Sequence, residues 1–210
     1  MYLALLIGMK RLMSDVTQLA HPLPVGSAGK LSGGWWGVLA MIVTEGSLFG
    51  YLLFSYFYLA AQTEQQWPPT GLPHLLLPGI NTAILLLSSV CVWASERCIR
   101  KKQTRWAIAA MALAIVLGIC FVGMQLNEWD KKTYGMTSDL YGSLYFTITG
   151  FHLCHVMIGL VILLLLLVWI SLGYFDDRRY AAVAIGGVYW HFVDVVWLFV
   201  FTSLYIFPYL

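Results

Sequence analysis

The sequence predicts an all-α, polytopic membrane protein, a bundle of five transmembrane helices. Two observations support this fold class. The chain of 210 residues is 60% hydrophobic and only 10% charged, whereas a soluble domain carries about 25% charged residues. Its apolar residues also come in long unbroken runs, not in the alternating pattern of a membrane β-barrel strand, and about 20 apolar residues span a bilayer as a helix. The net charge of +2 gives no reason to expect a nucleic acid partner.

The N-terminal segment, residues 1–34, is predicted to be a cytoplasmic or interfacial arm. Its apolar start is too short to span a membrane. Lys10 and Arg11 follow this start, and a signal peptide has the reverse order. Gly33 and Gly34 mark the end of the arm, and the transmembrane domain is expected over residues 35–210.

Five apolar runs define the expected helices. They cover residues 35–61, 75–94, 106–128, 140–172 and 181–207. Trp35 and Trp36 begin the first run and are predicted to anchor it at the membrane interface, with Trp36 in contact with lipid. A proline-rich connector, residues 62–73, separates the first two runs, and the fourth is long enough to tilt in the bilayer.

The distribution of lysine and arginine predicts the orientation of the chain. The arm, the loop after the second helix and the loop after the fourth helix hold 3 + 5 + 2 = 10 of the 12 basic residues. Lys131 and Lys132 are the two on the other side. Because cytoplasmic loops are enriched in these residues, we expect a cytoplasmic N-terminus and an outside C-terminus.

Ionisable residues within the expected spans are the candidate functional residues. They form a predicted buried polar network of Glu45, His152, His155, His191 and Asp194. A carboxylate near mid-membrane costs about 2.5–3.5 kcal/mol on an insertion scale, so it needs a partner. At 1.5 Å per residue, three of these side chains reach similar depths of roughly 15–18 Å. We therefore expect Glu45 to pair with His152, with His191 as the second choice and a backbone or hydroxyl acceptor as the alternative.

The same residues allow other interpretations. Histidines on two helices could bind haem or copper, but the widely spaced pairs of a two-haem cytochrome b are absent. Intramembrane carboxylates and histidines could also serve a proton-coupled transporter, although the paired broken helices of such proteins are missing. Glu96 and Glu128 are expected at solvated helix ends. The four cysteines form no CxxC pair and are expected to be small packing residues, so no metal site is predicted.

Three segments resemble a known family. They are Trp35-Trp36-Gly37 through Thr44-Glu45-Gly46 to Tyr56-Phe57-Tyr58, then Gly142 to Val156 with Gly150-Phe151-His152, and finally Tyr189 to Phe199. Together they resemble subunit III of the haem–copper oxidases, of the cytochrome c oxidase type. The resemblance begins at Trp35 and covers about 175 residues. It is to the five-helix bacterial form, which lacks the first two helices of the longest members.

The resemblance implies a non-catalytic role within an enzyme complex. Haem and copper would lie in the partner subunits I and II, and this chain would bind neither. It would contact subunit I directly, stabilise it and support proton uptake during oxygen reduction. It would also bind phospholipid, and we expect Arg178 and Arg179 to contact a headgroup. The position matching Glu45 is a carboxylate that reacts with carbodiimides. The expected location is the bacterial plasma membrane.

Two alternatives from the sequence remain beside this one. A quinol oxidase or a nitric-oxide-reductase accessory subunit would fit the same segments, since nothing in the chain binds the electron donor. An independent proton-coupled transporter is the alternative from another class. Such a transporter would migrate free of haem in native electrophoresis, whereas an oxidase subunit would migrate with it.

Overall fold

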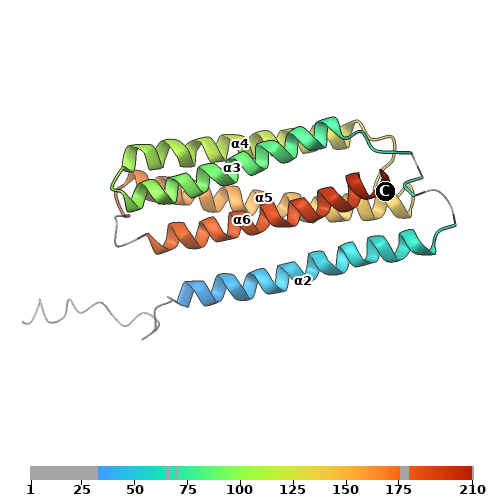
Figure 1. Ribbon diagram of the computed structural model, residues 1–210, viewed down its shortest axis with the longest axis horizontal. Coiled ribbons are helices and arrows are strands. Elements are labelled where there is room, and N and C mark those ends of the chain that lie inside the picture. The colour runs from blue at the N-terminus through green and yellow to red at the C-terminus, as the bar shows by residue number, and fades with distance from the viewer. Residues whose placement is uncertain (1–32, 65–66, 70, 176–179, 210) are drawn as a thin grey trace, which may run out of the picture. The chain divides into compact units, whose positions relative to one another are not determined.

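The computed structural model describes residues 33–64, 67–69, 71–175 and 180–209 (Figure 1). Its helices are α2 (Gly33–Gln62), α3 (Leu76–Arg100), α4 (Thr104–Asp130), α5 (Leu140–Ser171) and α6 (Ala181–Phe201), followed by a π-helix (Thr202–Ile206) and a 3₁₀ turn (Phe207–Tyr209). All five long helices are apolar enough to cross a membrane, which confirms the predicted fold class. Arg178, Arg179 and the predicted arm up to residue 32 lie outside the described residues.

The helix ends agree with the sequence prediction except at the end of α3. This helix continues to Arg100, six residues beyond the expected position 94. Glu96 and Arg100 stabilise the extra turns as an ion pair one turn apart. Lys102 then adopts a positive φ of 60°, the left-handed conformation that commonly follows a helix end.

Within Gly37–Leu210, four helices form a ring. Helix α3 packs against α4, α4 against α5, α5 against α6, and α6 against α3, and Figure 1 shows these helices lying side by side. Helix α2 contacts α5 and the 3₁₀ turn after α6 through side chains, among them Phe49 against His155 and Phe57 against Phe207. The most buried part of the chain is therefore the interior of the four-helix ring.

Trp190 of α6 fills the centre of this ring. Its side chain is fully buried, and its indole N–H donates to the Ser88 hydroxyl of α3 at 3.0 Å. The ring also lies against Gly118 of α4 and Gly159 of α5, where an added Cβ would come within 3.0 and 2.7 Å of indole carbons. Glycine at these two positions leaves the space that the indole occupies.

We expect Gly159→Ala to destabilise the protein by about 1–3 kcal/mol, because the new methyl group overlaps the Trp190 ring in a fully packed core. Gly150→Ala is the matched control on the same helix, since its Cβ would meet only an ordinary contact at 3.9 Å. Thermal unfolding in detergent, followed by circular dichroism, measures both. Equal midpoints for the two variants would contradict the packing described for Trp190.

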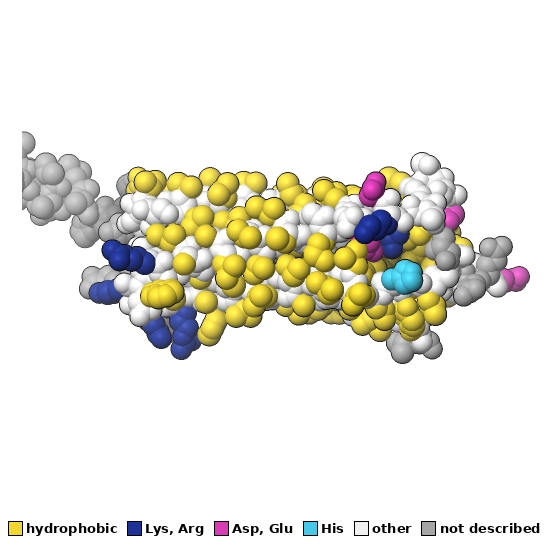
Figure 2. All heavy atoms as spheres, turned by 90° about the horizontal axis from the view of Figure 1, so that it is seen from above, with side chains coloured by type: hydrophobic (Ala, Val, Ile, Leu, Met, Phe, Trp, Pro, Cys, Tyr) yellow, Lys and Arg dark blue, Asp and Glu magenta, His cyan; other side chains and the backbone are white. Residues whose placement is uncertain are grey.

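The surface of the bundle matches a bilayer. Exposed leucine, valine, isoleucine and aromatic side chains occur along all five helices. Figure 2 shows hydrophobic side chains along most of one face, with the charged side chains near its two ends. Helix α5 begins at such an end, where the Asp139 carboxylate accepts a hydrogen bond from the Gly142 N–H and caps the helix.

Candidate functional site

Glu45 of α2 pairs with His155 of α5. Its carboxyl oxygen Oε2 lies 3.1 Å from Nε2 of the imidazole. The histidine is held from its other side, where Nδ1 lies 2.7 Å from the Phe151 carbonyl oxygen one turn earlier. Phe49, one turn after Glu45 on α2, packs edge-on against the same imidazole with ring centroids 5.1 Å apart. This is the main polar link between α2 and the ring of helices.

The hydrogen bonds of His155 determine where the shared proton can lie. The Phe151 carbonyl can only accept, so Nδ1 of His155 carries a hydrogen and donates it. The contact between Nε2 and Glu45 therefore needs one further proton. Either the imidazole is neutral and a protonated Glu45 donates to Nε2, or the imidazole is charged and the carboxylate accepts. In both states the pair satisfies a polar group within the membrane.

The predicted pairing of Glu45 with His152 is wrong. His152 is 1% exposed, and neither ring nitrogen has a hydrogen-bond partner among the described residues. Its imidazole lies among the rings of Phe49, Phe121 and Trp197. His152 and His155 are about 60° apart around the helix. Both imidazoles contact Phe49 of α2, but of the two only His155 reaches the Glu45 carboxylate. The depth argument favoured His152 over His155 and could not give this rotation.

We expect Glu45→Gln to cost less than about 1 kcal/mol of stability, because the amide can donate to Nε2 of a neutral His155. Glu45→Leu removes the only described partner of that nitrogen and should cost about 1–3 kcal/mol. Thermal unfolding in detergent compares the two variants. A leucine variant as stable as the glutamine variant would show that the pair does not hold α2 in place.

His191 of α6 reaches α3 and not α2. Its Nδ1 lies 2.5 Å from the Ser89 hydroxyl and 4.0 Å from the carboxyl oxygen Oδ2 of Asp194. The Asp194 side chain is 3% exposed, and no hydrogen bond to its carboxyl oxygens occurs in the described part of the chain. Serine and aspartate both approach the same imidazole nitrogen, so the three residues do not have the geometry of a nucleophilic triad, in which the base uses both nitrogens.

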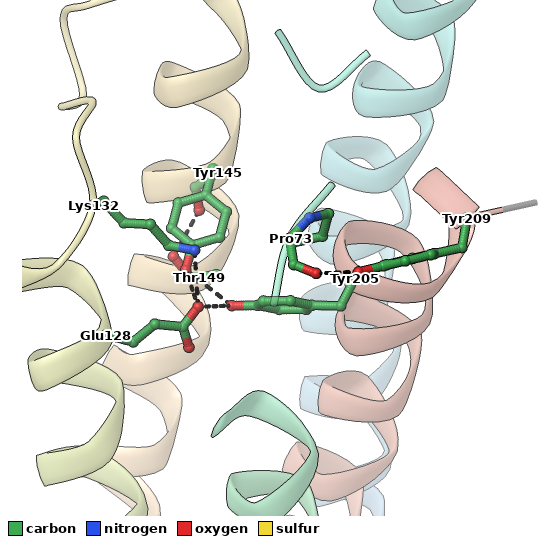
Figure 3. Close-up of polar contacts among 7 residues, drawn as sticks. All are labelled: Pro73, Glu128, Lys132, Tyr145, Thr149, Tyr205 and Tyr209. Carbon is green, nitrogen blue, oxygen red and sulfur yellow. Dashed lines mark hydrogen bonds and ion pairs between the residues drawn. The ribbon is translucent and has the colours of Figure 1, made fainter. Parts of the chain in front are cut away.

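Glu128 of α4 forms a second buried cluster, shown in Figure 3. The sequence prediction of a solvated helix end is wrong here, because Glu128 is only 6% exposed. Its oxygen Oε1 accepts hydrogen bonds from the hydroxyl groups of Tyr145 of α5, at 3.0 Å, and Tyr205, at 2.8 Å. The Lys132 ammonium lies 3.1 Å from the same oxygen. One carboxylate thus joins α4, α5 and the π-helix after α6.

Aromatic rings surround the lysine of this cluster. The Lys132 ammonium lies 4.9 Å from the ring centroid of Tyr145 and 5.9 Å from that of Tyr134, which are cation–π distances. Tyr134 lies in the loop between α4 and α5, and burial raises the pKa of its hydroxyl to about 12. The ring therefore stays neutral at physiological pH. A signal for this cluster exists in the sequence, since Lys132 follows Glu128 by one helical turn.

Two tryptophans of α6 donate hydrogen bonds to α3. Besides Trp190, the indole N–H of Trp197 donates to the Thr82 hydroxyl at 2.9 Å. These polar contacts satisfy groups inside the bundle and link neighbouring helices. In the part of the chain that the structure describes, no three histidine, cysteine, aspartate or glutamate side chains converge as metal ligands.

These features define a polytopic helical membrane protein in which hydrogen bonds between polar side chains link several of the helices. Comparison with known proteins gives the family. The family model described as cytochrome c oxidase subunit III matches residues 2–209. The chain is 35% identical over 173 residues to cytochrome c oxidase subunit 3 of Thermostichus vulcanus, a match covering 81% of this chain and 85% of that protein. The chain belongs to the cytochrome c oxidase subunit III family.

Animal relatives have the same name and similar identity. Cytochrome c oxidase subunit 3 of Struthio camelus is 33% identical over 212 residues, covering 98% of this chain and 80% of that protein. The protein of Coturnix japonica is 36% identical over 177 residues, covering 81% of this chain and 68% of its own length. The resemblance inferred from the sequence is therefore confirmed.

Proposed function

We propose that the chain is the non-catalytic subunit III of a cytochrome c oxidase, a membrane complex that reduces oxygen to water and translocates protons. Its family membership is the observation that carries this function. The haem and copper of such an enzyme would lie in subunits I and II. This chain would contact subunit I directly and protect it during turnover.

The contacts of the polar side chains favour a structural role for this chain within the complex. Glu45 is engaged by His155, His191 by Ser89, and Glu128 by two tyrosines and a lysine. A side chain that already binds another helix is not free to ligate a cofactor. We propose that the network of Glu45, His152, His155, His191 and Asp194 holds the helices in register instead of performing redox chemistry. Glu45, His155 and His191 would act through these hydrogen bonds. His152 and Asp194, which have no hydrogen-bond partner among the described residues, would act through packing.

We further propose the topology and the lipid contacts of the subunit. Residues 1–34 would form an arm on the cytoplasmic side of a bacterial plasma membrane, with residues 35–210 as the transmembrane domain and the C-terminus outside. Trp36, in the first turn of α2, is 64% exposed, as suits an interfacial anchor against phospholipid. Arg178 and Arg179 would meet lipid headgroups on the cytoplasmic side.

The turnover kinetics of the oxidase test the proposed role. We expect an oxidase lacking this subunit to reduce oxygen at a normal initial rate, because the metal centres belong to other chains. Its activity should then decay over many turnovers, and proton uptake should slow near neutral pH. Oxygen consumption of the purified complex, with and without the subunit, measures the decay.

Restoring the subunit to the depleted enzyme provides the control, because recovery of sustained turnover attributes the decay to this chain. A depleted enzyme whose rate stays constant over the same number of turnovers would contradict the protective role. An enzyme without any initial activity would contradict the proposal that the chain carries no catalytic centre.

A further inference from the structure

An apolar groove lies on the outer face of α3 beside α6. It is a depression of about 390 Å³ lined by Leu86, Ser89, Val90, Trp93 and His191. The Ser89 hydroxyl and the His191 imidazole bind each other at 2.5 Å, so the serine directs its polar group to the histidine. Leu86, Val90 and Trp93 are 40%, 57% and 52% exposed, and these side chains give the groove its apolar wall.

A basic depression continues this groove at the end of α3. Its volume is about 310 Å³, and its lining residues are Trp93, Glu96, Arg97, Arg100 and Lys101. Trp93 lines both depressions, so the apolar and the basic parts adjoin. Their α3 residues follow a spacing of three and four and therefore lie along one face of the helix. From Leu86 to Arg100 this face is about 21 Å long.

The basic depression is suited to an anion. Among the described residues that line it, three cations face one carboxylate, which leaves 3 − 1 = 2 positive charges in excess. Arg100 is paired with Glu96, and its guanidinium lies 4.6 Å from the Tyr180 ring centroid. The Arg97 guanidinium lies 5.3 Å from the Trp93 ring centroid and forms no ion pair among the described residues. Arg97 and Lys101 therefore supply the excess positive charge.

The apolar groove is suited to an acyl chain. Seven residues separate Trp93 from Leu86, a length of about 10 Å along the helix. One leaflet of the hydrocarbon core is about 15 Å thick, half of the 30 Å bilayer core. A groove of this length, starting at the basic depression, would fit within a single leaflet. An anionic group joined to a hydrocarbon chain is the chemistry that fits both parts at once.

We propose that this face of α3 binds one phospholipid with an anionic headgroup. Its phosphate contacts Arg97 and Lys101, and one acyl chain lies along Trp93, Val90 and Leu86. A transmembrane helix of another subunit would also fit an apolar groove, but it would not by itself supply an anion to Arg97 and Lys101, which form no ion pair with the described residues. The site depends on the membrane location of the chain and not on its role in an oxidase.

Photolabelling of the complete complex tests the site. The probe is phosphatidylglycerol with a diazirine in the middle of one acyl chain, exchanged into the purified complex and mapped by peptide mass spectrometry. We expect labelling between Leu86 and Trp93, and weaker labelling by phosphatidylcholine with the same chain. Arg97→Gln with Lys101→Gln should weaken phosphatidylglycerol binding by roughly 30-fold, from about 1 kcal/mol for each cation near a membrane surface.

The control is Arg105→Gln with Lys131→Gln, which removes the same charge outside both depressions and should leave labelling unchanged. Val90→Trp fills the groove without altering charge and should also abolish labelling, which covers the case that the double variant fails to assemble. Labelling of α3 that is independent of headgroup charge would overturn the proposal. Crosslinking of α3 to another subunit instead of lipid would overturn it too, whereas a complex without haem would contradict only the proposed function.

Discussion

Glu128→Leu should lower the stability of the protein by about 3–5 kcal/mol, since breaking a buried ion pair leaves an uncompensated charge. The Lys132 ammonium, whose side chain is 18% exposed, would lose its carboxylate partner. The hydroxyl groups of Tyr145 and Tyr205 would lose a shared acceptor in the same step. We expect the thermal unfolding midpoint to fall by about 10 °C for a chain of this size.

Glu96→Leu is the matched control for this prediction. Glu96 also pairs with a cation four residues later, but Arg100 is 52% exposed, and surface pairs contribute about 0–1 kcal/mol. Thermal unfolding in detergent should therefore separate the two leucine variants clearly. Equal midpoints for them would mean that the cluster around Glu128 does not stabilise the bundle.

Trp190→Ala should cost about 3–5 kcal/mol, the range observed for large-to-alanine changes in packed cores. The indole is fully buried between α4 and α5, so its removal leaves a cavity lined by Gly118 and Gly159. The Ser88 hydroxyl would also lose its donor. Denaturation of the detergent-solubilised protein measures the loss.

Trp106→Ala provides the comparison for this core substitution. Trp106 lies in the first turn of α4 and is 70% exposed, and surface substitutions usually stay within about 0.5 kcal/mol. The loss of stability in Trp190→Phe should lie between those of Trp190→Ala and Trp106→Ala, because phenylalanine keeps part of the ring and loses the hydrogen bond. A Trp190→Ala variant as stable as Trp106→Ala would refute the central packing position of this indole.

The number and type of the helices could be predicted from the sequence because length and apolar composition alone decide whether a segment spans a bilayer. The end of α3 could not, since its extra turns contain Glu96 and Arg100 and continue past the apolar run. A hydrophobicity pattern predicts the length of the apolar span. It does not predict how far the helix continues beyond that span.

The hydrogen-bond partners of side chains on different helices were harder to predict than the helices themselves. That Glu45 needs a partner follows from the cost of a buried carboxylate, but the choice between His152 and His155 depends on the rotation of α5. Sequence spacing gives the relative angle of two residues on one helix and not the direction of the neighbouring helix. The pairing of His191 with Ser89 depends on the same missing information.

Glu128 was misplaced for a different reason. Its position near the end of a helix, followed by Asp130 and Lys131, is typical of a solvated segment. Tyr145 and Tyr205 cover it from α5 and from the π-helix, and both are distant in sequence. The spacing of Glu128 and Lys132 was the local signal, but such pairs are common on exposed helix surfaces.

Co-purification of haem tests the central claim most directly. An affinity tag on this chain, followed by purification from membranes in mild detergent, should yield a complex with the absorbance of haem in the other subunits. After this chain is dissociated from the complex in its folded state, the separated chain should contain no haem. A tagged chain that migrates alone and free of haem in native electrophoresis would contradict its assignment as subunit III of an oxidase.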